Sequence, residues 1–271
     1  MRKTYNGWFG EFSLDPDIDY YGDGYWQRVS NKTYEPDTMV FLENNLNTST
    51  DFIDVGAATG AMTILAGKLG AQVLSFEAVP RVYEIAKAHL ACNPTLSNQI
   101  ILRNKAISSH PGILELGKNV DSKVLASISN EEPINAETAT VEIVSLIDEI
   151  ESFHRQEKKL VIKLDIEGAE WRLLSDEKTL DGLSRHKALV LLAIHPGFHR
   201  PFRVLPFGMT YFTKKYWQVQ NLFVAYLFFQ RILKVATIQR TSLDRIHSPK
   251  KCVLLMFGGY FEFILNFKET P

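Results

Sequence analysis

The most informative residues of this chain form a glycine-bearing turn that could hold a nucleotide-type cofactor. Residues 51–60 read DFIDVGAATG, an apolar run that leads directly into Gly56 and Gly60. Glycine frees the backbone at such a turn, because a Cβ would block the approach of a ligand or forbid the conformation. Residues 61–69 have helical spacing, so their first amides would offer the ligand the positive end of a helix.

An acidic residue after the next apolar run narrows the choice of cofactor. Residues 71–76 (AQVLSF) are β-prone and are followed by Glu77. In doubly wound folds an acid at this place accepts hydrogen bonds from ribose hydroxyls. A dinucleotide site would read G-x-G-x-x-G, whereas here Asp54 precedes Gly56 in the pattern Asp-x-Gly-x-x-x-Gly. That pattern favours S-adenosylmethionine over a nicotinamide cofactor, and the alternative is an ordinary turn without a ligand.

Two further residues lie where a reaction centre is expected. In open α/β sheets the centre lies beyond the carboxyl ends of the strands, and Asp165 and His195 each follow a predicted strand. A hydroxyl that accepts a methyl group must lose its proton to a general base or be acidified by a metal. Asp165 is predicted to lie beside the methyl group and the methionine amino group, and His195 is the candidate base. A purely structural role is the simpler alternative for His195.

Lys163 and Glu167 complete the candidate catalytic set. Lys163 lies inside an apolar run, where a lysine needs a partner such as Glu167, another carboxylate or the substrate. Glu167 and Glu170 open a helix, and the helix dipole alone would explain acids at that place. Asp165, Glu167 and His195 could together hold a divalent ion, but no metal is predicted.

The motifs resemble those of the FkbM-type family of S-adenosylmethionine-dependent methyltransferases. Residues 162–170 (IKLDIEGAE) match the family signature I-K-[IL]-D-[IV]-E-G-A-E. Further matching positions are Asp54, Gly56, Ala57, Gly60, Phe76, Glu77, Pro80, Asn93 and the lead-in Tyr34-Glu35-Pro36. The chain departs at Ala58, where the family usually has asparagine, and at Ala78, where it usually has proline. The resemblance spans residues 34–196.

This resemblance implies a function and a set of cofactor contacts. It implies S-adenosylmethionine as the methyl donor, S-adenosylhomocysteine as the product, and O-methylation of a hydroxyl on a sugar, glycan or other small-molecule natural product. The expected cofactor-binding residues are Tyr34, Glu35, Asp54, Gly56, Ala57, Ala58, Thr59, Gly60, Glu77, Ala78, Ala106 and Asp165. The alternatives are a lipid-linked or protein-borne acceptor, or a cofactor-binding module without turnover.

The elements that must position these residues predict an α/β fold. Strands are predicted at residues 52–55, 73–76, 100–103, 112–116, 140–144, 160–164 and 188–194, and helices at 36–46, 61–69, 81–91, 145–153 and over most of 211–235. Residues 251–257 and 260–267 flank Gly258-Gly259 and predict a hairpin. The alternation of strands and helices favours a mostly parallel α/β sheet, and its closing antiparallel hairpin resembles the end of the Rossmann-like, seven-stranded methyltransferase sheet.

Residues 1–35 are predicted to form an irregular, aromatic-rich N-terminal cap, and residues 36–271 a single methyltransferase domain. Nine of the chain's 31 aromatic residues (4 Trp, 10 Tyr and 17 Phe) lie in the cap. Aromatic faces with a polar edge would suit a sugar or polyketide acceptor, and the alternative is that the rings only attach the N-terminus to the sheet. Residues 202–217 are a second candidate wall of the acceptor pocket.

Composition argues against several other classes of protein. A net charge of −1 over 271 residues offers no basic surface for nucleic acid, and Cys92 and Cys252 suggest no disulfide framework. The first residues lack the apolar core of a signal peptide, so a cytoplasmic location is expected. Residues 222–229 are too few to span a bilayer, so a buried helix is the favoured interpretation and membrane-surface contact the alternative. The sequence does not define the oligomeric state.

Overall fold

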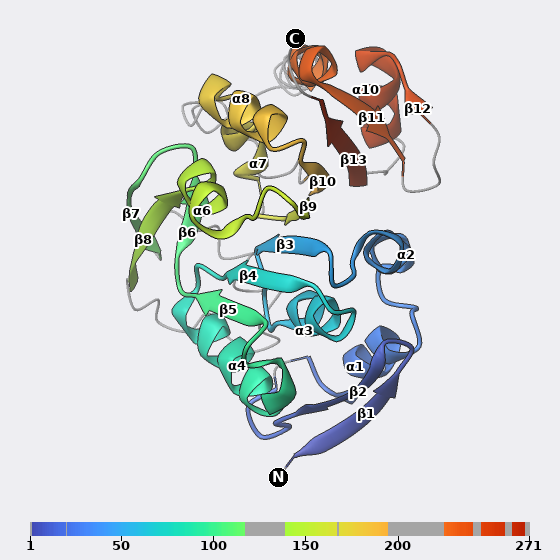
Figure 1. Ribbon diagram of the computed structural model, residues 1–271, viewed down its shortest axis with the longest axis vertical. Helices are drawn as coiled ribbons and strands as arrows, with labels where there is room; N and C mark the ends of the chain where they lie inside the picture. The colour runs from blue at the N-terminus through green and yellow to red at the C-terminus, as the bar shows by residue number, and fades with distance from the viewer. Residues whose placement is uncertain are drawn as a thin grey trace, which may run out of the picture. The chain divides into compact units, whose positions relative to one another are not determined.

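The computed structural model describes residues 2–19, 21–116, 139–166, 168–194, 225–240, 245–257 and 262–268. Contacts within the chain divide it into two units, Met1–Leu164 and Asp165–Pro271, which are described one at a time. Figure 1 labels the helices and strands of both units.

A parallel sheet forms the centre of the first unit. β3 (Thr50–Val55) pairs in parallel with β4 (Gln72–Phe76) and with β9 (Lys159–Leu164), and β5 (Ile100–Arg103) pairs in parallel with β4. Every residue of β3 is buried, as expected of a parallel strand that is covered on both faces. The register places Asp54 beside Ser75 on β4 and Lys163 on β9. The three sequence motifs therefore meet at the carboxyl ends of these parallel strands.

The predicted helices of this unit are confirmed close to their expected bounds. They are α2 (Pro36–Asn45), α3 (Ala61–Lys68), α4 (Pro80–Ala91) and α6 (Leu146–Phe153). α2 and α4 each begin with proline, which suits the first helical turn because its amide needs no partner there. α6 begins after Ser145, whose hydroxyl accepts a hydrogen bond from the amide of Asp148.

A small second sheet follows β5 and contains the two strands that were predicted at residues 112–116 and 140–144. It has the order β6-β8-β7, with β6 (Ala106–Ser108) parallel and β7 (Gly112–Leu116) antiparallel to β8 (Ala139–Ser145). The short helix η1 (Pro94–Leu96) precedes β5. An ion pair between Arg103 and Glu149 joins the end of β5 to α6.

The N-terminal segment is more regular than predicted. It forms an antiparallel hairpin of β1 (Lys3–Gly7) and β2 (Gly10–Leu14), followed by α1 (Asp23–Ser30) (Figure 1). The prediction of an irregular cap was wrong because each strand has only five residues, too few to show a clear alternation of polar and apolar side chains. The rings of Phe12 and Trp26, both almost fully buried, lie 6.0 Å apart and attach the hairpin to α1.

The second unit contains antiparallel strands. β10 (Leu189–Ala193) pairs with β13 (Glu262–Phe267), which pairs with β11 (Ala236–Gln239), and the two-residue β12 (Arg245–Ile246) lies beyond β11. Its helices are α7 (Glu170–Leu173), α8 (Glu177–Arg185) and α10 (Pro249–Phe257), with a further helical stretch at residues 225–235. In that stretch Phe229 is buried and its ring lies 5.1 Å from the ring of Phe263 on β13.

One arm of the predicted C-terminal hairpin is wrong. Residues 251–257 belong to the helix α10, while the second arm is the strand β13. A short apolar run fits either a helix or a strand, and here its neighbours decide. β13 nevertheless lies antiparallel between two strands, β10 and β11, as the fold requires.

The predicted fold class is confirmed. The described residues provide four parallel strands in the first unit and three longer antiparallel strands in the second, which together are the seven strands expected of a Rossmann-like methyltransferase, and β12 is an addition. The division between a cap at residues 1–35 and one domain at 36–271 stays a prediction. Nowhere in the described ranges is a helix both long and apolar enough to cross a bilayer.

Candidate active site

The glycine turn after β3 folds over the end of β4. The amides of Gly56 and Ala57 both donate to the carbonyl oxygen of Phe76, at 3.0 and 2.9 Å. Gly56, Ala58 and Gly60 have φ angles of 88°, 49° and 90°, all in the left-handed region. Glycine adopts this region freely, whereas alanine is strained in it. Backbone conformation thus explains the two glycines. Ala58 stands where the family usually has asparagine, and its left-handed conformation is strained.

Asp54 lies behind this turn and is completely buried. Its Oδ2 accepts a hydrogen bond of 2.7 Å from the hydroxyl of Thr63 on α3, and that hydroxyl lies 2.8 Å from the hydroxyl of Ser75 on β4. A buried carboxylate is stable only when it is hydrogen-bonded. This chain of contacts fixes the start of α3 to two strands of the sheet, and with it the position of the turn.

Glu77 contacts the glycine turn directly. One carboxylate oxygen accepts from the amide of Ala58 at 3.0 Å, and the other from the amide of Val79 at 2.8 Å. The side chain is 8% exposed, and burial raises its pKa to about 7 despite these two hydrogen bonds, which lower it. A carboxylate has about four acceptor positions, so Glu77 keeps acceptor capacity for the hydroxyl groups of a ligand.

Thr59 adds a buried hydroxyl to the turn. Its Oγ1 has no hydrogen-bond partner among the residues that the structure describes, and no side chain caps the N-terminus of α3. The turn thus holds an unused hydroxyl, free acceptor positions on Glu77 and the positive end of a helix. These groups fit a ligand that carries both hydroxyl donors and a carboxylate, as the cofactor expected from the sequence does.

Lys163 lies near Tyr25, around which Tyr34 and Glu35 also lie. It is 5% exposed on β9, and its charge acts on the hydroxyl of Tyr25 in α1. Burial raises the pKa of Tyr25 well above its ordinary value, the neighbouring Tyr34 and Glu35 raise it further, and Lys163 opposes them. The ring of Tyr25 lies 4.7 Å from that of Tyr34 and 4.4 Å from that of Tyr21. The structure therefore brings the predicted residues Tyr34, Glu35 and Lys163 into one neighbourhood.

The remaining catalytic candidates are placed only in part. Asp165 directly follows β9 and is half-buried, whereas Glu167 and His195 lie outside the described residues, as do residues 202–217. Glu170 is completely buried and accepts from the amides of Ile166 and Gly168, at 2.7 and 2.8 Å. This supports the structural interpretation of Glu170, because it shapes the turn that follows Asp165. Within the described ranges, no group of three or more His, Cys, Asp or Glu side chains is arranged to hold a metal.

Three further residues lie at the site: Asn104 and Ala106 around the turn after β5, and His89 on α4. The side-chain amide of Asn104 donates to the carbonyl oxygens of Glu77 and Ala78, at 2.8 and 3.2 Å, and so supports the turn that carries Glu77. Ala106, expected to contact the cofactor, is buried at the start of β6. His89 is buried on α4 with Nδ1 3.0 Å from the carbonyl oxygen of Thr59. The position of Asn104 after a predicted strand was a usable signal, whereas nothing in the helical pattern around His89 indicates its contact.

Comparison with family models gives a match over more than half of the chain. The family model described as "Methyltransferase FkbM domain" matches residues 54–213. No curated protein matches the chain in sequence.

Solved structures of methyltransferases are similar to the chain at low sequence identity. The FkbM methyltransferase from Methylobacillus flagellatus KT shares 13% identity at a TM-score of 0.40, with 92% of this chain and 56% of that chain covered. A geranyl diphosphate methyltransferase solved in complex with SAM shares 11% identity at a TM-score of 0.39, with 93% and 94% covered. The chain thus spans little more than half the length of the Methylobacillus protein.

Proposed function

This chain belongs to the FkbM family of methyltransferases, and we propose that it transfers the methyl group of S-adenosylmethionine to a hydroxyl oxygen of a sugar, glycan or other small molecule. The observation that carries the proposal is the contact between the buried carboxylate of Glu77 and the amide of Ala58 in the glycine turn. It joins the two motifs that an adenosine-bearing cofactor needs, an acceptor for ribose hydroxyls and a turn that exposes backbone amides.

The residues that would hold the cofactor follow from this arrangement. Glu77 would accept the ribose hydroxyls, and residues 56–60 with the start of α3 would contact the methionine part. Asn104 supports the backbone next to Glu77 and leads to Ala106, the predicted contact of the adenine. When bound, the cofactor supplies an electrophilic methyl group on a sulfonium, and the protein supplies orientation.

The protein's own chemical task is to place the acceptor hydroxyl and take up its proton. As the new carbon–oxygen bond forms and the sulfur–carbon bond breaks, the hydroxyl proton passes to a general base, which contributes roughly a hundred- to ten-thousand-fold in rate. Asp165 and His195 are the proposed candidates for this base, and Lys163 with Glu167 completes the proposed set. The cluster of Tyr21, Tyr25 and Tyr34 near Lys163 offers ring faces on which a sugar acceptor can stack.

Calorimetric titration with S-adenosylhomocysteine tests the cofactor site first. We expect micromolar binding to the wild type and to Glu84→Ala, an exposed control on α4, and loss of binding in Glu77→Ala. Failure of the wild type to bind would refute the proposed cofactor.

Transfer of a labelled methyl group to a panel of hydroxyl-bearing acceptors then tests the reaction. We expect Asp165→Ala and His195→Ala to lose turnover. Full activity in both variants would refute their assignment, and binding without turnover on any acceptor would favour a cofactor-binding module.

A further inference from the structure

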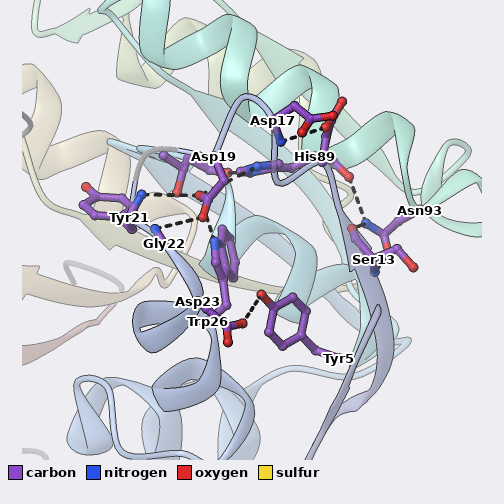
Figure 2. A network of polar contacts seen from close by, with 12 residues as sticks. Tyr5, Ser13, Asp17, Asp19, Tyr21, Gly22, Asp23, Trp26, His89 and Asn93 are labelled. Carbon is purple, nitrogen blue, oxygen red and sulfur yellow. Dashed lines mark hydrogen bonds and ion pairs between the residues drawn. The ribbon is translucent and has the colours of Figure 1, made fainter. Parts of the chain in front are cut away.

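A buried histidine lies between the N-terminal segment and the glycine turn, and Figure 2 shows its contacts with Asp19 and Asn93. His89 is completely buried on α4. Its Nδ1 lies 3.0 Å from the carbonyl oxygen of Thr59, and its Nε2 lies 3.9 Å from Oδ1 of Asp19. One ring thus faces the proposed cofactor turn on one side and the N-terminal segment on the other.

The contact with Thr59 defines the orientation of a peptide group in the turn. A carbonyl oxygen can only accept, so Nδ1 of His89 carries the hydrogen and donates. The amide of Gly60 belongs to the same peptide group and donates to the carbonyl oxygen of Ala57 at 2.9 Å. The peptide is therefore held at both ends, between Ala58 and Gly60, which both have left-handed backbones. Its orientation decides where the first amides of α3 point.

The other side of the ring faces a carboxylate that organises the N-terminal segment. Oδ1 of Asp19 accepts from the indole Nε1 of Trp26, and Oδ2 accepts from the amide of Gly22, each at 2.9 Å. The side chain of Asp19 is only 7% exposed. Trp26 also packs edge-on against His89, with ring centroids 5.2 Å apart at 89°. The loop before α1 and α1 itself are thereby built around the group that faces His89.

Asn93, two residues after the end of α4, holds the hairpin beside His89. Oδ1 of Asn93 accepts from the amide of Ser13 at 3.0 Å, and its Nδ2 donates to the carbonyl oxygens of Ser13 and His89, at 2.7 and 2.9 Å (Figure 2). This pairing fixes β2 against the same end of α4. A movement of the N-terminal segment would therefore reach the His89 ring.

We propose that His89 is a positioning residue for the cofactor site and that, through Asp19, it makes cofactor affinity depend on the N-terminal segment. The inference rests on the proposed function, because it assumes that residues 56–60 contact the methyl donor. The amide of Tyr21 donates to Oδ1 of Asp19 at 3.4 Å, and the Tyr21 ring belongs to the tyrosine cluster beside Lys163. An acceptor that binds to these tyrosines would thus act on the segment that holds His89, which couples acceptor binding to cofactor binding.

Two substitutions at His89 separate its hydrogen bond to Thr59 from the approach of Nε2 to Asp19, which at 3.9 Å is not a hydrogen bond. The side-chain nitrogen of asparagine takes the place of Nδ1, so His89→Asn keeps the donor to Thr59. The side-chain nitrogen of glutamine takes the place of Nε2, so His89→Gln keeps a group towards Asp19 but loses that donor. In cofactor-free protein we expect His89→Gln to exchange the amide hydrogens of residues 56–60 about fivefold faster than wild type, the factor that corresponds to one hydrogen bond. His89→Asn should exchange them at nearly the wild-type rate.

Affinity for S-adenosylhomocysteine gives the second measurement. We expect about fivefold weaker binding for His89→Gln, with recovery in His89→Asn, by the same factor for one hydrogen bond. Equal exchange and equal affinity in both variants would overturn the positioning role. If the wild type does not bind, the proposed function fails, and the exchange rates without cofactor still decide whether His89 holds the turn.

Asp19→Asn tests the link to the N-terminal segment without altering His89. The substitution keeps the shape of the side chain but removes its charge and leaves only one acceptor oxygen for Trp26 and Gly22. We expect this variant to bind S-adenosylhomocysteine more weakly than wild type. The amides of β3 should exchange at the wild-type rate, which would show that the central sheet is unchanged. Wild-type affinity in this variant, or in His89→Gln should that variant fold, would overturn the coupling.

Discussion

Glu77 should make cofactor affinity depend on pH, because its carboxyl titrates near neutrality. Burial raises its pKa to about 7 in the protein without cofactor, so the carboxyl is about half protonated at neutral pH. Ribose hydroxyls donate stronger hydrogen bonds to the charged form than to the neutral one, and binding therefore lowers this pKa. Affinity is accordingly full above pH 7 and is lost as the pH falls through 7.

The size of the effect follows from the pKa. If the bound carboxyl stays charged down to pH 6, the dissociation constant of S-adenosylhomocysteine should rise about eightfold between pH 7.5 and pH 6.0. At pH 7 binding should release about half a proton per site, because about half of the sites must lose one. The release is visible in calorimetry as a dependence of the observed enthalpy on the ionisation enthalpy of the buffer.

Glu77→Gln provides the test, since glutamine does not titrate. We expect weaker binding with no slope between pH 6.0 and 7.5, while Glu84→Gln on the exposed face of α4 keeps the wild-type slope. The assignment of Glu77 as the acceptor of the ribose hydroxyls would be refuted if the wild type released no proton on binding. It would also be refuted if the affinity of Glu77→Gln varied with pH as that of the wild type does.

The same structure supports further predictions. The raised pKa of folded Glu77 stabilises the cofactor-free protein below pH 4.5, and about 3 kcal/mol of this stability should be lost as the pH rises through 7. Urea denaturation at pH 5 and pH 8 tests this: an equal change in the free energy of unfolding between the two pH values for wild type and Glu77→Gln would contradict it. Ala58→Asn should raise the free energy of unfolding by about 0.5–1 kcal/mol, because asparagine tolerates the left-handed φ of 49°, and a lower value in the same assay would contradict the strain. Asn93→Leu should cost about 2 kcal/mol and speed proteolysis of residues 15–22, because two hydrogen bonds to Ser13 of β2 and one to His89 of α4 are lost; protease resistance equal to wild type would count against that role. Glu170→Gln should cost about 1–3 kcal/mol because one oxygen cannot serve the amides of Ile166 and Gly168, and an unchanged denaturation midpoint would show that the turn does not need both.

Local patterns account for the parts of the fold that could be predicted. The buried strand β3, the glycine turn and α3 follow one another within residues 50–68, and each has a clear periodicity or a residue that requires its conformation. The approach of Glu77 to the turn follows from a general rule of parallel sheets, in which adjacent strands end at the same edge.

Contacts between distant, weakly patterned segments could not be predicted. Residues 251–257 read as a strand but fold as α10, because a run of apolar residues this short fits both periods. His89 has an ordinary place in an amphipathic helix, and only the packed structure shows that its ring reaches the carbonyl oxygen of Thr59. Asp19 carries no motif at all and becomes informative only beside Trp26 and His89.

The register of the central sheet also has a consequence for how the chain is synthesised. β3 pairs with β4 at Asp51–Gln72, but its other edge pairs with β9 at Asp51–Leu160. A ribosome adds about 5–20 residues per second, so the nascent strand waits for several seconds with one edge unpaired. Such non-local parallel pairing is intrinsically slow and exposes the open edge to aggregation. The glycine turn and the Glu77 strand are thus complete well before the strand that leads to Asp165 emerges, and chaperones would find their natural target at the open edge of β3.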